Sequence, residues 1–216
     1  MSALHERPPT VGVFCSACPH PEYEPLAEDT GRQIASRGAE VIYGGGTTGC
    51  MGALARGAHA AGGTVTGITP LFLHDPRSRP AWNQFLTNGM HARKDRIYEP
   101  CVGFLALPGG PGTMDELFEV AVWSKHRIHR PPRPFRPLVL VNWGGYWDGL
   151  LQQLGRTVTE GLLADDTRAD LFRVAGTTSE ALDKLGIPSA HHRRPAAVAQ
   201  TPAIKPMAAP HTKRKA

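Results

Sequence analysis

The residues best suited to chemistry lie in one short stretch at 107–120, which reads LPGGPGTMDELFEV. Its first six residues include three glycines and two prolines, and Glu116 follows within a helix-like segment. Glycines let backbone N–H groups approach an anion at a helix N-terminus, where unsatisfied amides and the helix dipole favour negative charge. The stretch therefore predicts an anion-binding loop with an acid close to it.

Glu116 also has a purely structural interpretation. Thr113 and Glu116 are three residues apart at a helix start, which is the spacing of a capping box. Glu119 lies three residues further on, where it either supports Glu116 or is simply solvated. The sequence alone leaves both interpretations of Glu116 open.

A second glycine-rich loop, GGGTTGCMG at 44–52, follows one strand-like run and precedes another helix-like segment. Ligands of open parallel sheets bind outside the carboxyl ends of the strands, which is where both loops fall. The Lys-Ser/Thr pair of a P-loop is absent, and GxGxxG at Gly44, Gly46 and Gly49 follows the second strand rather than the first. The alternative is that these glycines serve only tight turns and close packing.

A second charged group of residues lies in MHARKDRIYE at 90–99. As a helix, this segment places Arg93, Lys94 and Arg96 around one turn. An ordinary solvated helix with ion pairs is the alternative interpretation.

Two kinds of segment alternate along the chain. Short, nearly continuous apolar runs, typical of strands buried on both faces, lie at 11–15, 39–43, 64–69, 102–108 and 137–143. Segments with apolar residues at helical spacing lie at 22–38, 49–62, 88–100, 112–127 and 146–163. This alternation predicts βαβ units in a doubly wound parallel sheet, an α/β fold in a single domain.

Charge is distributed unevenly over the chain. The net charge is +5, but six of the 24 Lys/Arg and none of the 19 Asp/Glu lie at 191–216, so residues 1–190 carry a net charge of −1. From residue 188 the chain is rich in Pro and Ala and has no periodicity. We therefore predict a folded domain at 1–187 and a disordered basic tail at 188–216. A solvated tail is the expected state, and nucleic acid is not expected as a partner.

Cysteine usage and hydropathy indicate the cellular compartment. Cys15, Cys18, Cys50 and Cys101 are few for this length, whereas disulfide scaffolds are typical of small secreted chains. The CxxC pair at residues 15 and 18 lacks a second such pair, so we interpret it as structural thiols rather than a redox or zinc site. No long apolar span exists, and the first ten residues lack the apolar stretch of a signal peptide. A cytoplasmic protein without membrane contact is therefore predicted.

Together these motifs resemble the LOG (Lonely Guy) family of phosphoribohydrolases, which release a nucleobase from a nucleoside 5′-monophosphate and are often mislabelled lysine decarboxylases. The family signature PGGxGTxxE is matched by PGGPGTMDE at 108–116. An Arg-Lys pair shortly after a methionine is matched by Met90, Arg93 and Lys94. Weaker matches at VFC, YGGGTTGCMG and VLVNWGGYWDGLL extend the resemblance over about residues 11–185.

The resemblance implies a Rossmann-like fold, a homodimer, a nucleoside 5′-monophosphate substrate and no metal or other cofactor. It implies that Arg93 and Glu116 are the catalytic pair. The carboxylate would stabilise an oxocarbenium-like transition state and orient or deprotonate water, while the guanidinium would hold the carboxylate and stabilise charge on the departing base. The positions expected to bind phosphate or substrate are Ser16, Gly45, Gly46, Met90, Lys94, Gly109, Gly110, Gly112, Thr113 and Glu119.

Two departures from the family pattern bear on the substrate. FCSAC places Ser16 where glycine is usual and Cys18 where serine is usual, and SKHRIHRPPRPFRP at 124–137 is longer and more basic than the family norm. AMP or N6-modified AMP, such as a cytokinin ribotide, is the substrate expected from the family. The alternatives are a CMP-type pyrimidine nucleotide hydrolase of a nucleoside-antibiotic pathway and a non-catalytic nucleotide or cofactor carrier on the same scaffold.

Overall fold

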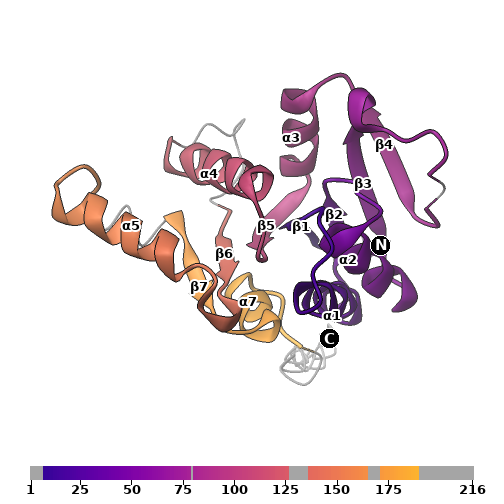
Figure 1. The fold of residues 1–216 in the computed structure, drawn as a ribbon. Coiled ribbons are helices and arrows are strands. Elements are labelled where there is room, and N and C mark those ends of the chain that lie inside the picture. Colours follow the sequence, from indigo (N-terminus) through magenta and orange to yellow (C-terminus); the bar gives the residue numbers. More distant parts are fainter. Residues whose placement is uncertain (1–6, 79, 127–135, 165–170, 190–216) are drawn as a thin grey trace, which may run out of the picture.

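Within residues 7–78, 80–126, 136–164 and 171–189, which the computed structural model describes, seven parallel strands form one sheet (Figure 1). The strands are β1 (Thr10–Phe14), β2 (Glu40–Tyr43), β3 (Val65–Pro70), β4 (Asn83–Thr87), β5 (Cys101–Ala106), β6 (Leu138–Val141) and β7 (Arg173–Ala175). Their spatial order is β4-β3-β2-β1-β5-β6-β7. The prediction of a doubly wound parallel α/β fold is confirmed.

The strand order reverses beside β1. The chain builds outward from β1 through β2, β3 and β4, then returns to pair β5 with the other side of β1. In such sheets, ligands bind in the crevice outside the carboxyl ends of the strands at the reversal. The loops that follow β1 and β5 therefore border the expected position of a site.

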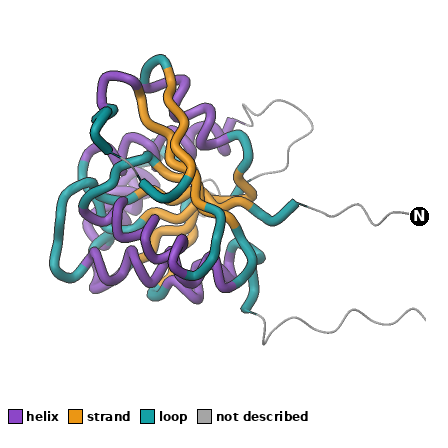
Figure 2. The backbone as a smooth tube through the Cα atoms, turned by 90° about the vertical axis from the view of Figure 1, so that its right-hand side faces the viewer, coloured by secondary structure: helices purple, strands orange, loops and turns teal. Residues whose placement is uncertain are grey.

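Helices cover both faces of the sheet (Figures 1 and 2). One face packs against α1 (Tyr23–Ser36), α2 (Gly49–Ala60) and α7 (Thr178–Lys184). The other face packs against α3 (Met90–Tyr98), α4 (Pro111–His126) and α5 (Asp148–Thr159). Each face of the sheet thus has its own hydrophobic core.

Alternation along the strands divides the side chains between the two cores. Val13 of β1 belongs to the core under α1 and α2, whereas the next residue, Phe14, stacks on Phe104 under α3 and α4. Successive side chains of a strand point to opposite faces, so a continuous apolar run is needed to supply both. This requirement explains why the central strands were recognisable in the sequence.

Some elements were not predicted. β4 has a polar sequence, NQFLT, and forms one edge of the sheet, while β7 has three residues and lies at the other edge. Neither strand is buried on both faces, so neither carries an apolar run. Helix α7 was also missed, although Thr177 accepts a hydrogen bond from the Glu180 N–H at 3.2 Å in the pattern of a capping box.

The predicted tail lies almost entirely outside the described residues, since the description ends at Ser189. The basic insertion at 127–135 lies outside them as well. The domain boundary at 187/188 and the disorder of the tail therefore stay predictions. None of the helices in the described parts is long and apolar enough to cross a membrane.

Candidate active site

Helix α4 begins directly after the glycine-rich loop. Pro111 is its first residue, a position where proline is favoured because an N–H there would lack a helical partner. The Met114 N–H donates to the Gly110 carbonyl oxygen at 3.1 Å, so the first turn is already formed at Thr113. Thr113 is therefore the third helical residue rather than an N-cap. The capping-box interpretation of Glu116 does not hold.

A buried ion pair joins α3 to α4. Arg93 Nη1 lies 2.8 Å from Glu116 Oε1, and each residue exposes only 8% of its surface. Arg93 Nε donates to the Ile68 carbonyl oxygen at 3.1 Å, and Nη2 donates to that of Gly44 at 3.3 Å. These carbonyls belong to the end of β3 and to the loop after β2. The guanidinium thus ties the acid of α4 to the carboxyl edge of the sheet.

Glu116 is a much weaker acid than an exposed glutamate. Burial raises the pKa of Glu116 from 4.5 to about 7, and the Asp115 carboxylate adds to the rise. The charges of Arg93 and Lys94 lower this pKa but do not offset burial. A carboxyl group that titrates near neutral pH has the acidity that a general base requires.

Lys94 forms ion pairs with two carboxylates close to Glu116 in the sequence. Its Nζ lies 2.8 Å from Asp115 Oδ2 and 2.7 Å from Glu119 Oε2. Burial lowers the pKa of Lys94, but the hydrogen bonds to these carboxylates outweigh it and raise the pKa overall. Lys94 and Glu119 thus form a second, partly buried layer next to the Arg93–Glu116 pair.

Open space lies beside the two glycines that flank Pro111. Among the described residues, no heavy atom would lie within 4 Å of a Cβ built on Gly110 or Gly112, apart from the glycine's own neighbours in the chain and helix, and neither glycine has a positive φ. Neither packing nor backbone conformation requires glycine at these positions, whereas close approach of a ligand would. Gly109 differs, because its Cβ would lie 2.1 Å from Thr113 Oγ1.

In the loop at 44–49, other parts of the protein occupy the space beside the glycines. A Cβ at Gly44 would lie 2.0 Å from Arg93 Nη2, and one at Gly45 would lie 2.1 Å from Thr69 Oγ1. Gly45 also has a φ of +78°, which side chains rarely adopt. The packing alternative raised for this loop therefore accounts for these two glycines.

The same loop still borders a cavity. Gly45 and Gly46 line a hollow of about 320 Å³ that extends from Arg93 to the segment between β3 and β4. A Cβ at Gly46 would lie 2.9 Å from Met51 Cε, the far end of a flexible side chain. Substrate binding by Gly45 and Gly46 stays a prediction.

Ser16 and Met90 lie on the segments that surround the pair. The Ser16 hydroxyl accepts a hydrogen bond from the Cys18 N–H at 3.0 Å, and the Ser16 carbonyl accepts one from the Met51 N–H at 3.0 Å. Ser16 thus holds the turn after β1 against the start of α2. Met90 is the first residue of α3, three positions before Arg93. Their roles in substrate binding also stay predictions.

One residue at the site was missed by the sequence analysis. Tyr146 Oη donates a hydrogen bond of 2.7 Å to the carbonyl oxygen of Gly109, 37 residues earlier in the chain. The weak family match VLVNWGGYWDGLL includes this tyrosine. No local pattern, however, indicates a bond between a side chain and a loop that distant in sequence.

The four cysteines are free thiols, with Cys15, Cys50 and Cys101 buried and Cys18 exposed. Burial raises the pKa of the Cys15 thiol, and the nearby Cys50 and Glu116 raise it further. A buried thiol of this kind is unreactive, as expected for a structural cysteine. Across the described residues, no three His, Cys, Asp or Glu side chains are grouped so that they could hold a metal ion.

Comparison with known proteins relates this site to one family. A family model described as "Possible lysine decarboxylase" matches residues 51–185. The cytokinin riboside 5′-monophosphate phosphoribohydrolase of Rhodococcoides fascians is 36% identical over 167 residues, which cover 75% of this chain and 82% of that protein. The corresponding enzyme LOG of Oryza sativa subsp. japonica is 33% identical over 177 residues, which cover 80% of this chain and 71% of that protein.

Solved structures show the same architecture. The molybdenum cofactor carrier protein of Chlamydomonas reinhardtii superposes with a TM-score of 0.59 at 25% identity, covering 83% of this chain and 98% of that chain. DNA processing protein A of Streptococcus pneumoniae shares the fold with a TM-score of 0.52 at 13% identity, over 82% of this chain and 62% of that chain.

The parallel sheet, with a buried carboxylate–guanidinium pair at the carboxyl ends of its strands, defines a Rossmann-like α/β protein with a site near the strand-order reversal. At this level of similarity over most of its length, the chain belongs to the LOG family, whose curated relatives are named phosphoribohydrolases.

Proposed function

We propose that the protein hydrolyses the N-glycosidic bond of a nucleoside 5′-monophosphate to give the free base and ribose 5-phosphate. The observation that carries this proposal is the buried pair of Glu116 and Arg93, which stands one helical turn from the open glycines Gly110 and Gly112. Glu116 is thus an acid on α4, the helix that begins at the anion-binding loop.

Glu116 acts on the water molecule. In its ionised form the carboxylate accepts a proton from water as the water oxygen bonds to the anomeric carbon, and the electron pair of the broken C–N bond leaves with the base. The same negative charge stabilises the oxocarbenium-like transition state. Arg93 holds the carboxylate in place and stabilises negative charge that develops on the departing base.

The glycine-rich loop holds the 5′-phosphate. Its glycines leave room for an anion at the N-terminus of α4, where unpaired N–H groups and the helix dipole favour negative charge. Binding energy from this remote group holds the nucleotide in the site with its ribose over Glu116.

The nucleobase is adenine or an N6-substituted adenine in this proposal, because the relatives are named for cytokinin riboside 5′-monophosphates. A CMP-type pyrimidine nucleotide is the second candidate, since SKHRIHRPPRPFRP at 124–137 departs from the family pattern. A non-catalytic carrier is the third, supported by the likeness to the molybdenum cofactor carrier protein. A carrier, however, gains nothing from a buried carboxylate beside its ligand.

Product analysis tests the proposal. Purified protein is incubated separately with AMP, N6-isopentenyl-AMP, CMP, GMP and UMP, and free base and ribose 5-phosphate are separated by chromatography. Glu116→Gln is the test variant, and Glu160→Gln, at an exposed glutamate directly after α5, is the matched control. We expect release from the adenine nucleotides with wild type and control only. Release from CMP alone would select the pyrimidine candidate, and tight binding without release would replace the enzyme with the carrier.

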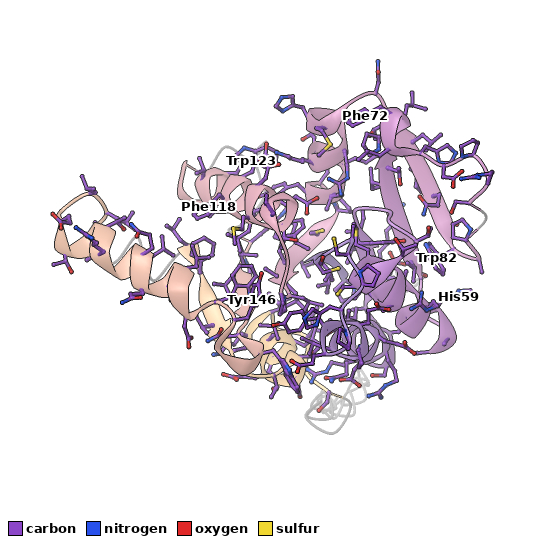
Figure 3. The ribbon with its side chains drawn as sticks, in the orientation of Figure 1. His59, Phe72, Trp82, Phe118, Trp123 and Tyr146 are labelled. Atoms are coloured by element: carbon purple, nitrogen blue, oxygen red, sulfur yellow. The ribbon has the colours of Figure 1, made fainter. Side chains whose placement is uncertain are left out.

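We further propose that the protein is a homodimer that pairs through α4. Met114, Phe118 and Val122 are spaced four residues apart and are 38%, 40% and 47% exposed, so α4 presents an apolar stripe (Figure 3 labels Phe118). A second copy would cover this stripe next to the site. Sedimentation velocity tests the assignment. We expect a dimer that Phe118→Glu converts to a monomer, while Leu162→Glu, at an apolar residue 78% exposed elsewhere, stays dimeric.

A further inference from the structure

The segment between β6 and α5 is a turn with a well-defined shape. Gly144 and Gly145 have φ values of +59° and +77°, a conformation that residues with a side chain rarely adopt. Asn142 closes the turn, since its Oδ1 accepts the Trp147 N–H at 2.7 Å and its Nδ2 donates to Asp148 Oδ1 at 2.8 Å. The turn therefore fixes the backbone at Tyr146, the residue that follows Gly145, and so the direction in which this side chain leaves it.

The Tyr146 ring is held by other aromatic rings. It meets Tyr23 edge-on at 5.6 Å between ring centroids and Trp147 edge-on at 4.9 Å, and Trp147 is fully buried (Figure 3 labels Tyr146). Tyr23 in turn stacks on His20 at 4.1 Å. Edge-to-face contacts of this kind favour one ring orientation. The hydroxyl of Tyr146 is thus placed by segments that follow β1 and β6, on either side of the glycine-rich loop after β5.

The hydroxyl acts on the backbone of the glycine-rich loop. It donates to the Gly109 carbonyl oxygen at 2.7 Å, the usual distance for a hydrogen bond from a hydroxyl to a carbonyl oxygen. In a trans peptide, the form of almost all peptide bonds, the C=O and the N–H point in opposite directions. Holding the carbonyl toward Tyr146 therefore turns the Gly110 N–H away from it. The space beside Gly110 and Gly112 is open, which leaves room there for an anion.

We propose that Tyr146 is a positioning residue for phosphate recognition, which sets the direction of the Gly110 amide through its bond to the Gly109 carbonyl. This inference rests on the proposed function, because it assigns the anion to the 5′-phosphate of the nucleotide. Without the hydroxyl, the Gly109–Gly110 peptide has no side-chain partner within the described parts of the chain to oppose its rotation, and glycine restricts that rotation less than any other residue. The loss falls on binding of the phosphate, not on cleavage of the glycosidic bond.

The test compares Tyr146→Phe with Tyr23→Phe. Both variants lose one tyrosine hydroxyl and keep the ring contact between residues 23 and 146, but only the first loses the bond to Gly109. For Tyr146→Phe, we expect the KM for the nucleotide to rise roughly tenfold, the size of one lost hydrogen bond to a charged group, with kcat within about twofold. Tyr23→Phe should match the wild type in both constants.

Calorimetric measurement of the Kd for two parts of the nucleotide, ribose 5-phosphate and adenosine, separates phosphate recognition from a general structural effect. For Tyr146→Phe, the Kd of ribose 5-phosphate should rise by the same factor as the KM, whereas the Kd of adenosine, which has no phosphate, should stay unchanged. Equal weakening of both ligands, or a fall in kcat at constant KM, would overturn the proposal. So would a wild-type protein that binds no ribose 5-phosphate. If the wild type binds ribose 5-phosphate but releases no base, the proposed function fails, and the two Kd values still decide the role of Tyr146.

Discussion

Two glycine-rich loops lie at the same edge of the sheet, one after β2 and one after β5, and they use glycine for different reasons. Gly44 and Gly45 make room for Arg93 and Thr69 of the protein itself. Gly110 and Gly112 have open space where a side chain would lie, and their backbone conformations do not require glycine. Similar sequence motifs can therefore be filled by internal packing in one loop and leave open space in another.

The two loops are joined through the Arg93–Glu116 ion pair. The first loop contributes the Gly44 carbonyl that Arg93 binds, and the second starts the helix that carries Glu116. We therefore regard the first loop as the support for the guanidinium and the second as the receptor for the substrate anion. Four predictions follow from this assignment. Two of them concern Glu116, and the other two compare the loops directly.

The largest effect is expected for Glu116→Gln. The substitution keeps the size of the side chain but removes the charge that accepts the proton, so kcat/KM should fall about 10³-fold, within the range for loss of a general base. Steady-state kinetics with the preferred nucleotide measure this loss. Activity within tenfold of the wild type, in protein whose circular dichroism is unchanged, would remove Glu116 from the chemistry.

Gly110→Ala tests the second loop as a receptor. The methyl group would enter the space assigned to the phosphate, so the KM should rise roughly tenfold or more, as for one or two lost hydrogen bonds to a charged group. The Tm should stay equal or rise slightly, because alanine stabilises a compatible glycine position by about 0.4–1 kcal/mol through the unfolded chain. A lower Tm with an unchanged KM would contradict the assignment.

Gly45→Ala tests the first loop and should show the opposite pattern. The methyl group would meet Thr69 Oγ1 at 2.1 Å and force a side chain into a positive φ, which costs about 1–3 kcal/mol. The Tm should fall by several degrees, as measured by calorimetry. The KM of the protein that remains folded should change less than in Gly110→Ala. If the two variants behave alike, the distinction between the loops is wrong.

The last prediction is a dependence on pH within the wild type. Because catalysis needs ionised Glu116, whose pKa is about 7, kcat/KM should rise with pH through about 7 and level off above it. The free energy of unfolding should instead decrease as pH rises over this range. Between pH 4.5 and about 7 the folded protein holds a proton that the unfolded chain has lost, so the contribution of Glu116 is full below pH 4.5 and is lost as pH rises through about 7.

Glu116→Gln is the control for both pH dependences. Its side chain has no proton to exchange, so its unfolding free energy, from urea titrations at several pH values, should lack the decline that Glu116 causes in the wild type. A wild-type activity profile that is flat from pH 5.5 to pH 8 would show that Glu116 titrates well below neutral pH.

Much of the fold was predictable because its signals are local. The buried runs that became β1, β2, β3, β5 and β6 must serve two hydrophobic cores, so their apolar residues are continuous. The edge strands β4 and β7 have no such requirement and were missed. Helix α7 was missed because it has only seven residues, although its N-cap Thr177 and first-turn Glu180 have the spacing of a capping pair.

The sequence by itself determined the α/β class, the two loops, the acid and the arginine, because each depends on residue type and short-range spacing. Tertiary structure alone decided how they are used. Arg93 binds carbonyls 25 and 49 residues away in the chain, and Tyr146 binds one 37 residues away. Whether the space beside a glycine is filled or open also depends on side chains brought there by the fold. Packing across the sheet sets such contacts, and no periodicity along the chain encodes them.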